Sequence, residues 1–272
     1  MHIAHSSVKL CQQLDTLRFR GGTRRCISLV ATRGDLHEGH GAVINAAKTV
    51  SDVVVVAILP TGCNPTENLV TNNEFKDIGF IERHQADILF APPEEPLTGN
   101  QPLLVNFNDI DEQFRLPPAT LTSHLKVLNA VQPDIMVWGE RNFIELSQVR
   151  RLISELGIRT QVQCIPTVRH ANGVAVSTND HLFSEEDNAM LPTIFATLRN
   201  AAHAIRAGAT RLRKVENTAK LAIKGAGFDL EYFHILDEEH LTPATDATTT
   251  YRIVTSARIN DIPVADSLGL TL

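Results

Sequence analysis

Short apolar runs alternate with amphipathic segments over the first two thirds of the chain. The runs at 27–32 and 53–59 have few polar residues and no alternation, which is typical of parallel strands covered on both faces. Between them, apolar residues from Val43 to Val50 recur at spacings of three and four, which predicts a helix that starts near Gly39. A strand, a helix and a second strand within this length form a βαβ unit.

The same alternation continues to about residue 168. Further strands are predicted at 86–91, 134–138 and 160–168, and further helices at 75–84, 119–131 and 143–156. A polar, proline-rich region separates the strand at 86–91 from the helix at 119–131. Strands and helices in alternation predict an α/β fold with a doubly wound parallel sheet.

The pattern changes after residue 168. Two long helices are predicted at 184–207 and 211–225, followed by a pair of strands at 230–236 and 251–257. We therefore expect two domains. Residues 1–168 form a nucleotide-binding domain, and residues 169–272 form a smaller α+β domain.

The segment Gly34–His40, which reads Gly-Asp-Leu-His-Glu-Gly-His, lies between a predicted strand and a predicted helix. Doubly wound proteins bind ligands at this edge of the sheet, and a helix start attracts phosphate through its backbone N–H groups. His37 and His40 are three residues apart and face the same side of the first turn, while Gly39 lets a phosphate approach the backbone. Two imidazoles there can stabilise charge as a leaving group departs, so the segment indicates a nucleotide site.

Two other interpretations of the histidine pair stay open. Histidines at a helix start can serve only as caps or as surface residues. A metal site is the weaker alternative, because His37 and His40 need further ligands and the sequence offers no acidic or cysteine partner at ligand spacing. The remaining histidines, His124 among them, have no motif around them and are interpreted as surface or structural residues.

Composition narrows the class of protein. The 272 residues are 43% hydrophobic, and 25 Lys and Arg against 31 Asp and Glu give a net charge of −6, which argues against a broad nucleic-acid or membrane surface. The longest apolar run, at 53–59, is too short to span a membrane, and the N-terminus lacks the apolar core of a signal peptide. None of the 4 cysteines forms a CxxC pair, which favours a cytoplasmic protein.

The motifs together resemble those of the pantothenate synthetase, or pantoate–β-alanine ligase, family. Gly34–His40 resembles the family's GxLHxGH, Val131–Asp134 with Trp138–Asn142 resembles VQPD followed by FGEKD, and Val174–Asp180 resembles LALSSRN. The stretch Arg252–Asp266 also follows the family's last strand region. The resemblance covers essentially the whole chain.

This resemblance implies a Rossmann-like N-terminal domain, a smaller C-terminal lid and a homodimer. It also implies a reaction with small-molecule substrates and without nucleic acid or membrane as partners. In the family, ATP activates pantoate as an acyl-adenylate with the help of Mg²⁺, and β-alanine then displaces AMP.

The resemblance assigns residues to this reaction. His40, His37 and Arg141 are the candidate catalytic residues. Candidate substrate-binding residues are Asn64 and Glu145, where the family has glutamines that hold pantoate. The candidate ATP-binding residues are Arg33, Gly34, Gly39, Gly139, Glu140, Asn142, Val168, Val176, Ser177, Thr178 and Asn179.

Several of these positions depart from the family pattern. Arg33 replaces a methionine, Arg141 a lysine, Asn142 an aspartate and Asn179 an arginine. At Glu145 a second carboxylate about 4 Å from the acid costs roughly 1 to 4 kcal/mol, unless Glu145 is protonated or turned away. Arg33 offsets this charge if it points into the same pocket.

Three hypotheses follow. The first is an active ligase with pantoate and β-alanine, or analogues of them, as substrates. The second is a nucleotide-binding paralogue with impaired catalysis, because several site positions have changed together. The third is a nucleotidyltransferase with another acceptor, because the HxGH motif also serves that chemistry.

Overall fold

The computed structural model describes residues 1–59, 74–92 and 103–272. The chain divides into two compact units. The first contains Met1–Gly139 and Ile144–Ile165, and the second contains Glu140–Phe143 and Pro166–Leu272. Asn64, a predicted substrate-binding residue, lies outside the described residues.

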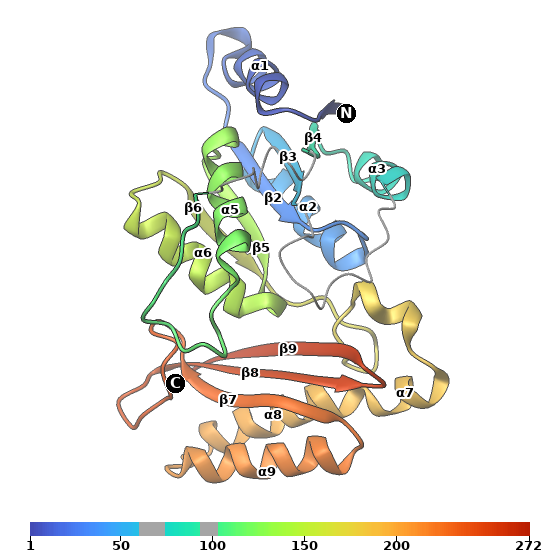
Figure 1. The fold of residues 1–272 in the computed structure, drawn as a ribbon, viewed down its shortest axis with the longest axis vertical. Coiled ribbons are helices and arrows are strands. Elements are labelled where there is room, and N and C mark those ends of the chain that lie inside the picture. The colour runs from blue at the N-terminus through green and yellow to red at the C-terminus, as the bar shows by residue number, and fades with distance from the viewer. Residues whose placement is uncertain (60–73, 93–102) are drawn as a thin grey trace. The chain divides into compact units, whose positions relative to one another are not determined.

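The first unit is built on a parallel sheet, which has six strands in the described part of the chain (Figure 1). From one edge to the other these are β1 (His2–Ala4), β4 (Ile88–Phe90), β3 (Val53–Ile58), β2 (Ile27–Thr32), β5 (Ile135–Gly139) and β6 (Gln161–Ile165). The sheet confirms the predicted doubly wound α/β fold.

Helices of the first unit pack on this sheet. They are α1 (Ser7–Arg18), α2 (Glu38–Val50), α3 (Glu74–Arg83), α5 (Pro118–Val131) and α6 (Phe143–Glu155). Val54 and Val56 of β3 form one core cluster with Ile44 of α2 and Ile81 of α3. Because the central strands are covered, β3 is buried from Val53 to Ala57, which explains its unbroken apolar sequence.

Strand β1 and helix α1 do not follow from the hydrophobic pattern. Strand β1 has three residues, too few to show a period. In α1 only Leu10 and Leu14 are buried, so its apolar face is one turn long. Both elements are positioned by tertiary contacts, since β1 pairs with β4 and α1 packs on α5.

The order of the strands reverses between β2 and β5. The chain continues from β2 to β3 and β4 on one side, whereas β5 and β6 lie on the other. Ligands of doubly wound proteins bind outside the carboxyl ends of the strands at such a switch point. Arg33 directly follows β2, and Gly139 ends β5, so both lie at this edge.

The second unit contains an antiparallel sheet of three strands within the described residues, β7 (Asp229–Asp237), β8 (Thr250–Ile259) and β9 (Ile262–Thr271). The predicted pairing of the strands at 230–236 and 251–257 is confirmed as β7 with β8. Strand β9 was not predicted, because a tight turn with left-handed Asn260 and Asp261 joins it directly to β8.

The helices of the second unit cover this sheet. They are α7 (Glu185–Met190), α8 (Pro192–Arg206) and α9 (Leu212–Gly225). The single helix predicted at 184–207 is divided at Leu191, because Pro192 has no N–H group to continue the hydrogen-bond ladder. Leu198 of α8 and Ile223 of α9 pack against Phe233 and Ile253 in one core cluster.

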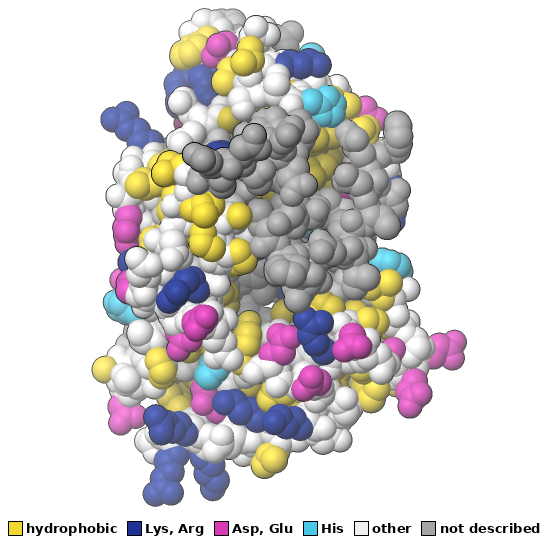
Figure 2. Space-filling view, in the orientation of Figure 1, with side chains coloured by type: hydrophobic (Ala, Val, Ile, Leu, Met, Phe, Trp, Pro, Cys, Tyr) yellow, Lys and Arg dark blue, Asp and Glu magenta, His cyan; other side chains and the backbone are white. Residues whose placement is uncertain are grey.

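The surface of the second unit carries charges of both signs. Figure 2 shows Lys and Arg side chains near Asp and Glu side chains on its visible face. None of the helices in the described ranges is long and apolar enough to cross a membrane.

The core of the second unit can be tested at Leu198, which is fully buried at 0% exposure. Leu198→Ala is expected to lower the free energy of unfolding by about 2–5 kcal/mol, because it leaves a cavity among packed side chains. Urea denaturation measures this loss. Leu221→Ala in α9 is the matched control, because Leu221 is 73% exposed, and it is expected to change the free energy by less than about 0.5 kcal/mol. Equal losses in the two variants would contradict the assignment of this core.

Candidate active site

The chain turns sharply between β2 and α2. Gly34 and Asp35 both have left-handed backbone conformations, with φ of 91° and 48°. The Asp77 carboxylate of α3 accepts the N–H groups of Asp35 and Leu36 at 2.9 and 2.8 Å. A Cβ atom on Gly34 would make a tight contact of 3.1 Å with this carboxylate, and a φ of 91° is strained for other residues, so the position favours glycine.

His37 and His40 cap the start of α2 reciprocally. His37 is the N-cap, and its Nδ1 accepts the N–H of Gly39 at 3.0 Å. Nδ1 of His40 accepts the N–H of His37 at 3.3 Å. The two ring centroids are 4.1 Å apart, so the structure brings the predicted catalytic histidines together.

These hydrogen bonds determine the tautomers of both rings. A backbone N–H can only donate, so Nδ1 of His37 and Nδ1 of His40 must each offer a lone pair. The proton of each neutral imidazole is therefore on Nε2. The interpretation of these histidines as caps is correct for Nδ1, and Nε2 is the nitrogen of each neutral ring that carries the proton.

Gly39 has a structural role that the sequence did not suggest. A Cβ atom at this position would lie 2.7 Å from Cε1 of His37, closer than atoms approach in proteins. The His37 ring therefore rests on Gly39, and any other residue would push it away from its capping position. The predicted access of a phosphate to the backbone at Gly39 remains an expectation.

Arg33 and Glu145 form an ion pair between the loop after β2 and the first turn of α6. The guanidinium binds the carboxylate with two hydrogen bonds, from Nη2 to Oε1 at 2.6 Å and from Nη1 to Oε2 at 3.2 Å. The Arg33 side chain is 22% exposed and that of Glu145 10%. The Arg33 charge thus lies beside Glu145, as the sequence required for offsetting a second carboxylate.

His124 of α5 completes this group. Its Nε2 lies 2.8 Å from Oε1 of Glu145, and its side chain is 1% exposed. Burial raises the pKa of Glu145, but Arg33 and His124 outweigh burial and lower the pKa to about 2. Glu145 is therefore ionised and can only accept hydrogen bonds, so Nε2 of His124 carries a proton.

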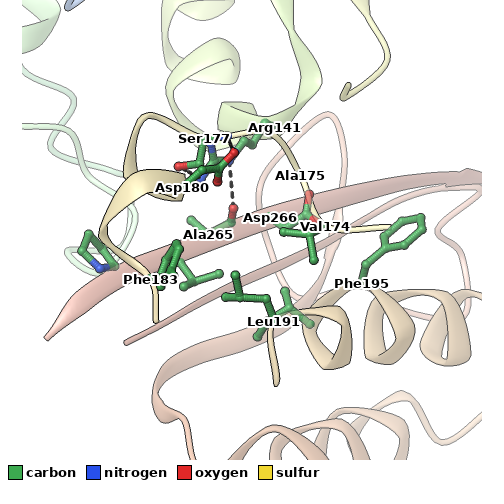
Figure 3. A pocket seen from close by; sticks show the side chains of 13 residues that line it. Arg141, Val174, Ala175, Ser177, Asp180, Phe183, Leu191, Phe195, Ala265 and Asp266 are labelled. Atoms are coloured by element: carbon green, nitrogen blue, oxygen red, sulfur yellow. Dashed lines mark hydrogen bonds between the residues drawn. The ribbon is translucent and has the colours of Figure 1, made fainter. Parts of the chain in front are cut away.

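The second unit holds the other predicted catalytic residue, Arg141. Its guanidinium donates to the carbonyls of Ala265 and Val176 at 3.1 and 3.0 Å, and to Oγ of Ser177 at 3.1 Å. Burial lowers the pKa of Arg141, while Asp266 and Asp180 act in the opposite direction. Figure 3 shows Arg141, Ser177 and Asp180 together at the polar side of a pocket.

Apart from Asp266, the rest of this pocket is apolar. Val174, Leu191, Ile194 and Phe195 are among the residues that line it. The Ser177 hydroxyl, at its polar side, accepts hydrogen bonds from Arg141 and from the N–H of Asn179. Its own hydrogen is therefore the atom that Ser177 can donate to a ligand.

The remaining predicted ATP-binding residues of the second unit are held by local contacts. Val176 donates its N–H to the carbonyl of Val168 at 3.0 Å. The Asn179 amide donates to the carbonyl of Pro263 at 3.1 Å, and Thr178 begins the short 3₁₀ helix that Ser177 caps. Asn142 is exposed.

Glu140 is tied to the sheet of the second unit. Its carbonyl accepts the Ser267 hydroxyl at 2.7 Å, and its carboxylate lies 3.5 Å from the buried Arg252 guanidinium. Arg252 also stacks on Phe143, at 3.9 Å from the ring centre. Gly139 ends β5 in the first unit, and nothing in the structure requires a glycine there.

Sequence reasoning missed Asp77 and His124. Both are polar residues inside amphipathic helices, at positions where the pattern predicts a buried apolar side chain. A buried carboxylate or imidazole must find a partner, so each position was a signal for a polar contact. The sequence could not show which partner, because Asp77 binds a loop some forty residues earlier and His124 binds a different helix.

Comparisons with known proteins agree with one another. The family model described as pantoate-beta-alanine ligase matches residues 2–269. The chain is 30% identical to pantothenate synthetase of Methylococcus capsulatus, over 90% of this chain and 91% of that protein. It is 28% identical to pantothenate synthetase of Alcanivorax borkumensis, over 100% of this chain and 99% of that protein.

Two solved structures have the same fold. Pantothenate synthetase from Thermus thermophilus has a TM-score of 0.85 with 22% identity, and the match covers 98% of this chain and 99% of that one. Pantoate-beta-alanine ligase from Francisella tularensis, complexed with beta-gamma ATP and beta-alanine, has a TM-score of 0.75 with 22% identity, over 98% of this chain and 97% of that one.

The ion pair predicts how stability depends on pH. Because the pKa of Glu145 is about 2 in the folded chain and ordinary in the unfolded chain, the pair stabilises the fold fully above about pH 4.5. This stabilisation is lost as the pH falls toward 2. When the pH is lowered from 7 to 3, the free energy of unfolding should therefore fall by about 1–3 kcal/mol less in Glu145→Gln than in the unaltered chain.

Urea denaturation at each pH measures this difference. The control is Glu155→Gln, because Glu155 pairs with Arg151 but its side chain is 53% exposed. An exposed pair is expected to contribute less than about 1 kcal/mol. If the free energy of unfolding falls by the same amount at low pH in the Glu145 variant and in the unaltered chain, the pairing is contradicted.

Proposed function

Since the chain belongs to the pantoate-beta-alanine ligase family, we propose that it is an ATP-dependent ligase that activates a carboxylic acid as an acyl-adenylate and joins it to an amine. The observation that carries the proposal is the pair of histidines at the start of α2. Their Nδ1 atoms accept backbone N–H groups in the helix cap, so the proton of each ring is on Nε2, and both rings lie at the helix start, where backbone N–H groups attract phosphate. This arrangement supplies donors of the kind that phosphate oxygens accept.

The two steps of the reaction follow from this arrangement. An oxygen of the acid attacks the α-phosphorus of ATP, the bond to the β-phosphate oxygen breaks, and pyrophosphate leaves with the negative charge. Nε2–H of His37 and Nε2–H of His40 stabilise this charge. The amine then attacks the acyl carbon, and AMP leaves with the bonding electrons and the oxygen that joined it to the acid.

The other motif residues lie in the second unit. We propose that Arg141, Ser177 and Thr178 bind phosphate oxygens, as the resemblance implies. In support, Arg141 is charged and the Ser177 hydroxyl retains a hydrogen to donate. Asn179 has a neutral side chain where the family has a cation, so phosphate binding relies more on Arg141.

The acid and the amine are pantoate and β-alanine, or close analogues. Pantothenate synthetase relatives at 28–30% identity support this pair. The acid is proposed to bind near Arg33, Glu145 and Asn64. A charged group at this place, in which Arg33 and Glu145 neutralise each other, favours an acid with polar substituents over one that is only hydrocarbon.

Mg²⁺ is proposed to accompany ATP. Within the described ranges, no three His, Cys, Asp or Glu side chains are grouped as a metal site. Glu145 is occupied by Arg33 and His124, and Asp77 by two backbone N–H groups. These residues do not form a site of their own for the metal, which fits an ion that is held mainly by the phosphates.

The proposal also includes a homodimer in the cytoplasm. The homodimer follows from the resemblance, and the cytoplasmic location follows from the spacing of the cysteines in the sequence. Light scattering on the purified protein is expected to give twice the 29.9 kDa mass of the chain.

The alternatives predict other products. A nucleotidyltransferase would leave a stable nucleotide adduct on its acceptor instead of an amide and AMP. A paralogue with impaired catalysis would bind ATP without turnover.

The ligase reaction can be tested by acid-dependent exchange of pyrophosphate into ATP. A panel of acids that includes pantoate is expected to contain at least one that gives exchange, with release of AMP once an amine is added. His40→Gln is expected to lower exchange by about 10²-fold or more, because charge on the leaving group loses a donor. His203→Gln, an exposed residue of α8, is the control with unchanged exchange. Absence of exchange with every acid would exclude the ligase.

The role of the ion pair can be tested by a double-mutant cycle with the active acid. Arg33→Met leaves the buried Glu145 carboxylate without its Arg33 cation and should raise the KM for the acid, whereas Glu145→Gln removes a carboxylate and should not raise it. The double variant should recover part of this loss, with a coupling of about 0.5–3 kcal/mol. Strictly additive changes would show that Arg33 and Glu145 act on the acid independently.

A further inference from the structure

Several aspartates of the first unit accept backbone N–H groups at the ends of strands. Asp52 accepts the N–H of Cys26, Asp134 that of Ile27, and Asp87 that of Val54, each at 2.8 or 2.9 Å. These three contacts lie at the amino ends of β2 and β3, where the strands begin. They hold strand starts in place at the edge opposite to the histidine pair.

Asp77 makes the same kind of contact at the other edge of the sheet. It binds the loop that follows β2, with the N–H of Asp35 on Oδ2 at 2.9 Å and the N–H of Leu36 on Oδ1 at 2.8 Å. Each carboxylate oxygen of Asp77 therefore accepts one hydrogen bond, and Asp77 is only 3% exposed. Two N–H donors at adjacent residues require two acceptor atoms, which an ionised carboxylate provides.

The loop that Asp77 binds has an uncommon backbone conformation. Two consecutive residues, Gly34 and Asp35, have positive φ, and Asp35 is not a glycine. Residues other than glycine are uncommon in this conformation, although aspartate adopts it more readily than most, so surrounding contacts help to hold it. The Asp77 carboxylate provides such contacts, because it accepts the N–H groups of Asp35 and Leu36 at the end of the turn.

The histidines begin where this contact ends. Leu36, whose N–H is held by Asp77, is followed by His37, the N-cap of α2. The N–H of His37 is in turn accepted by Nδ1 of His40. A shift of Leu36 is therefore transmitted through one peptide group to both imidazoles.

We propose that Asp77 is a positioning residue of the ligase reaction, holding the Gly34–Leu36 loop so that His37 and His40 present Nε2–H to the phosphates. This inference rests on the proposed function. Asp77 itself touches no reacting atom, and it acts through the two backbone N–H groups that it accepts. Burial also raises the pKa of Asp77, which is the cost of placing a carboxylate here when an apolar side chain would pack without it.

The test compares Asp77→Asn with Asp87→Asn. Asparagine has the shape of aspartate, but its NH₂ group would face one of the two N–H donors of the loop. Asp87 makes an equivalent hydrogen bond to the N–H of Val54 at the opposite edge of the sheet, so its variant is the matched control. Both variants are expected to lower Tm by a few degrees.

Only Asp77→Asn is expected to reduce pyrophosphate exchange, by about 10²-fold in kcat with a smaller change in the KM for the acid. The measurements are made at a temperature at which circular dichroism shows both variants folded. Calorimetry with a non-hydrolysable ATP analogue, without any acid, is expected to show weaker binding for Asp77→Asn than for Asp87→Asn. Equal kcat and equal nucleotide affinity in the two variants would overturn the proposal.

A second variant covers the case in which Asp77→Asn does not fold. Gly34→Ala places a Cβ 3.1 Å from the Asp77 carboxylate and disfavours a φ of 91°, so it perturbs the same contact from the loop. It is expected to lower kcat in the same way, and an unchanged kcat would count against the proposal. If the unaltered chain gives no exchange with any acid, the ligase function fails, while the calorimetric comparison still decides the role of Asp77.

Discussion

Strand β2 pairs in parallel with β3 on one side and with β5 on the other, and the chemistry of the first unit depends on this pairing. Because β3 and β5 both run parallel to β2, the carboxyl ends of all three strands lie at the same edge of the sheet. The loop with His37 follows β2, and the helix with Glu145 follows β5. Arg33 and Glu145, which are more than a hundred positions apart in the sequence, therefore meet because the pairing of the strands brings their elements together.

The charges at this edge are balanced locally. Arg33 and Glu145 are both departures from the family pattern, and Glu145 is a buried charge whose compensation comes in part from Arg33. A bidentate pair with His124 as a further partner satisfies Glu145 on both oxygens. Such a group adds little to stability compared with apolar packing, because desolvation offsets its attraction. The group instead orients side chains, because it holds Arg33, His124 and Glu145 in one arrangement beside the proposed site.

Much of the fold was accessible from the sequence, and the reasons are physical. The buried strands at 27–32 and 53–59 are continuous in apolar residues because both faces are covered, and the strand at 27–32 has the observed bounds. Elements that depend on neighbours were missed. The short strand β1 exists through its pairing with β4, and β9 through its turn from β8. The break before Pro192 was readable in principle, since proline cannot continue a helix.

The candidate site was predictable where it is local and unpredictable where it is not. His37, Gly39 and His40 lie within one turn, so their spacing alone brings them together. The contacts of Asp77 and His124 join separate helices to a loop and to another helix, and spacing carries no information about them. Nor did the sequence show that Nδ1 of each motif histidine accepts a backbone N–H group, which puts the proton of each neutral ring on Nε2.

The four residues Glu140–Phe143 belong to the second unit, although the chain on both sides of them belongs to the first. The polypeptide therefore passes between the units three times, and a single cut at residue 165 would not separate them. A fragment that began at Pro166 would lack the carbonyl that Ser267 donates to and the ring on which Arg252 stacks. During synthesis, this short segment leaves the ribosome long before the strands that bind it, so the second unit can complete its packing only after the last strand has emerged. A chimera of two relatives joined at residue 165 would take the two sides of these contacts from different parents.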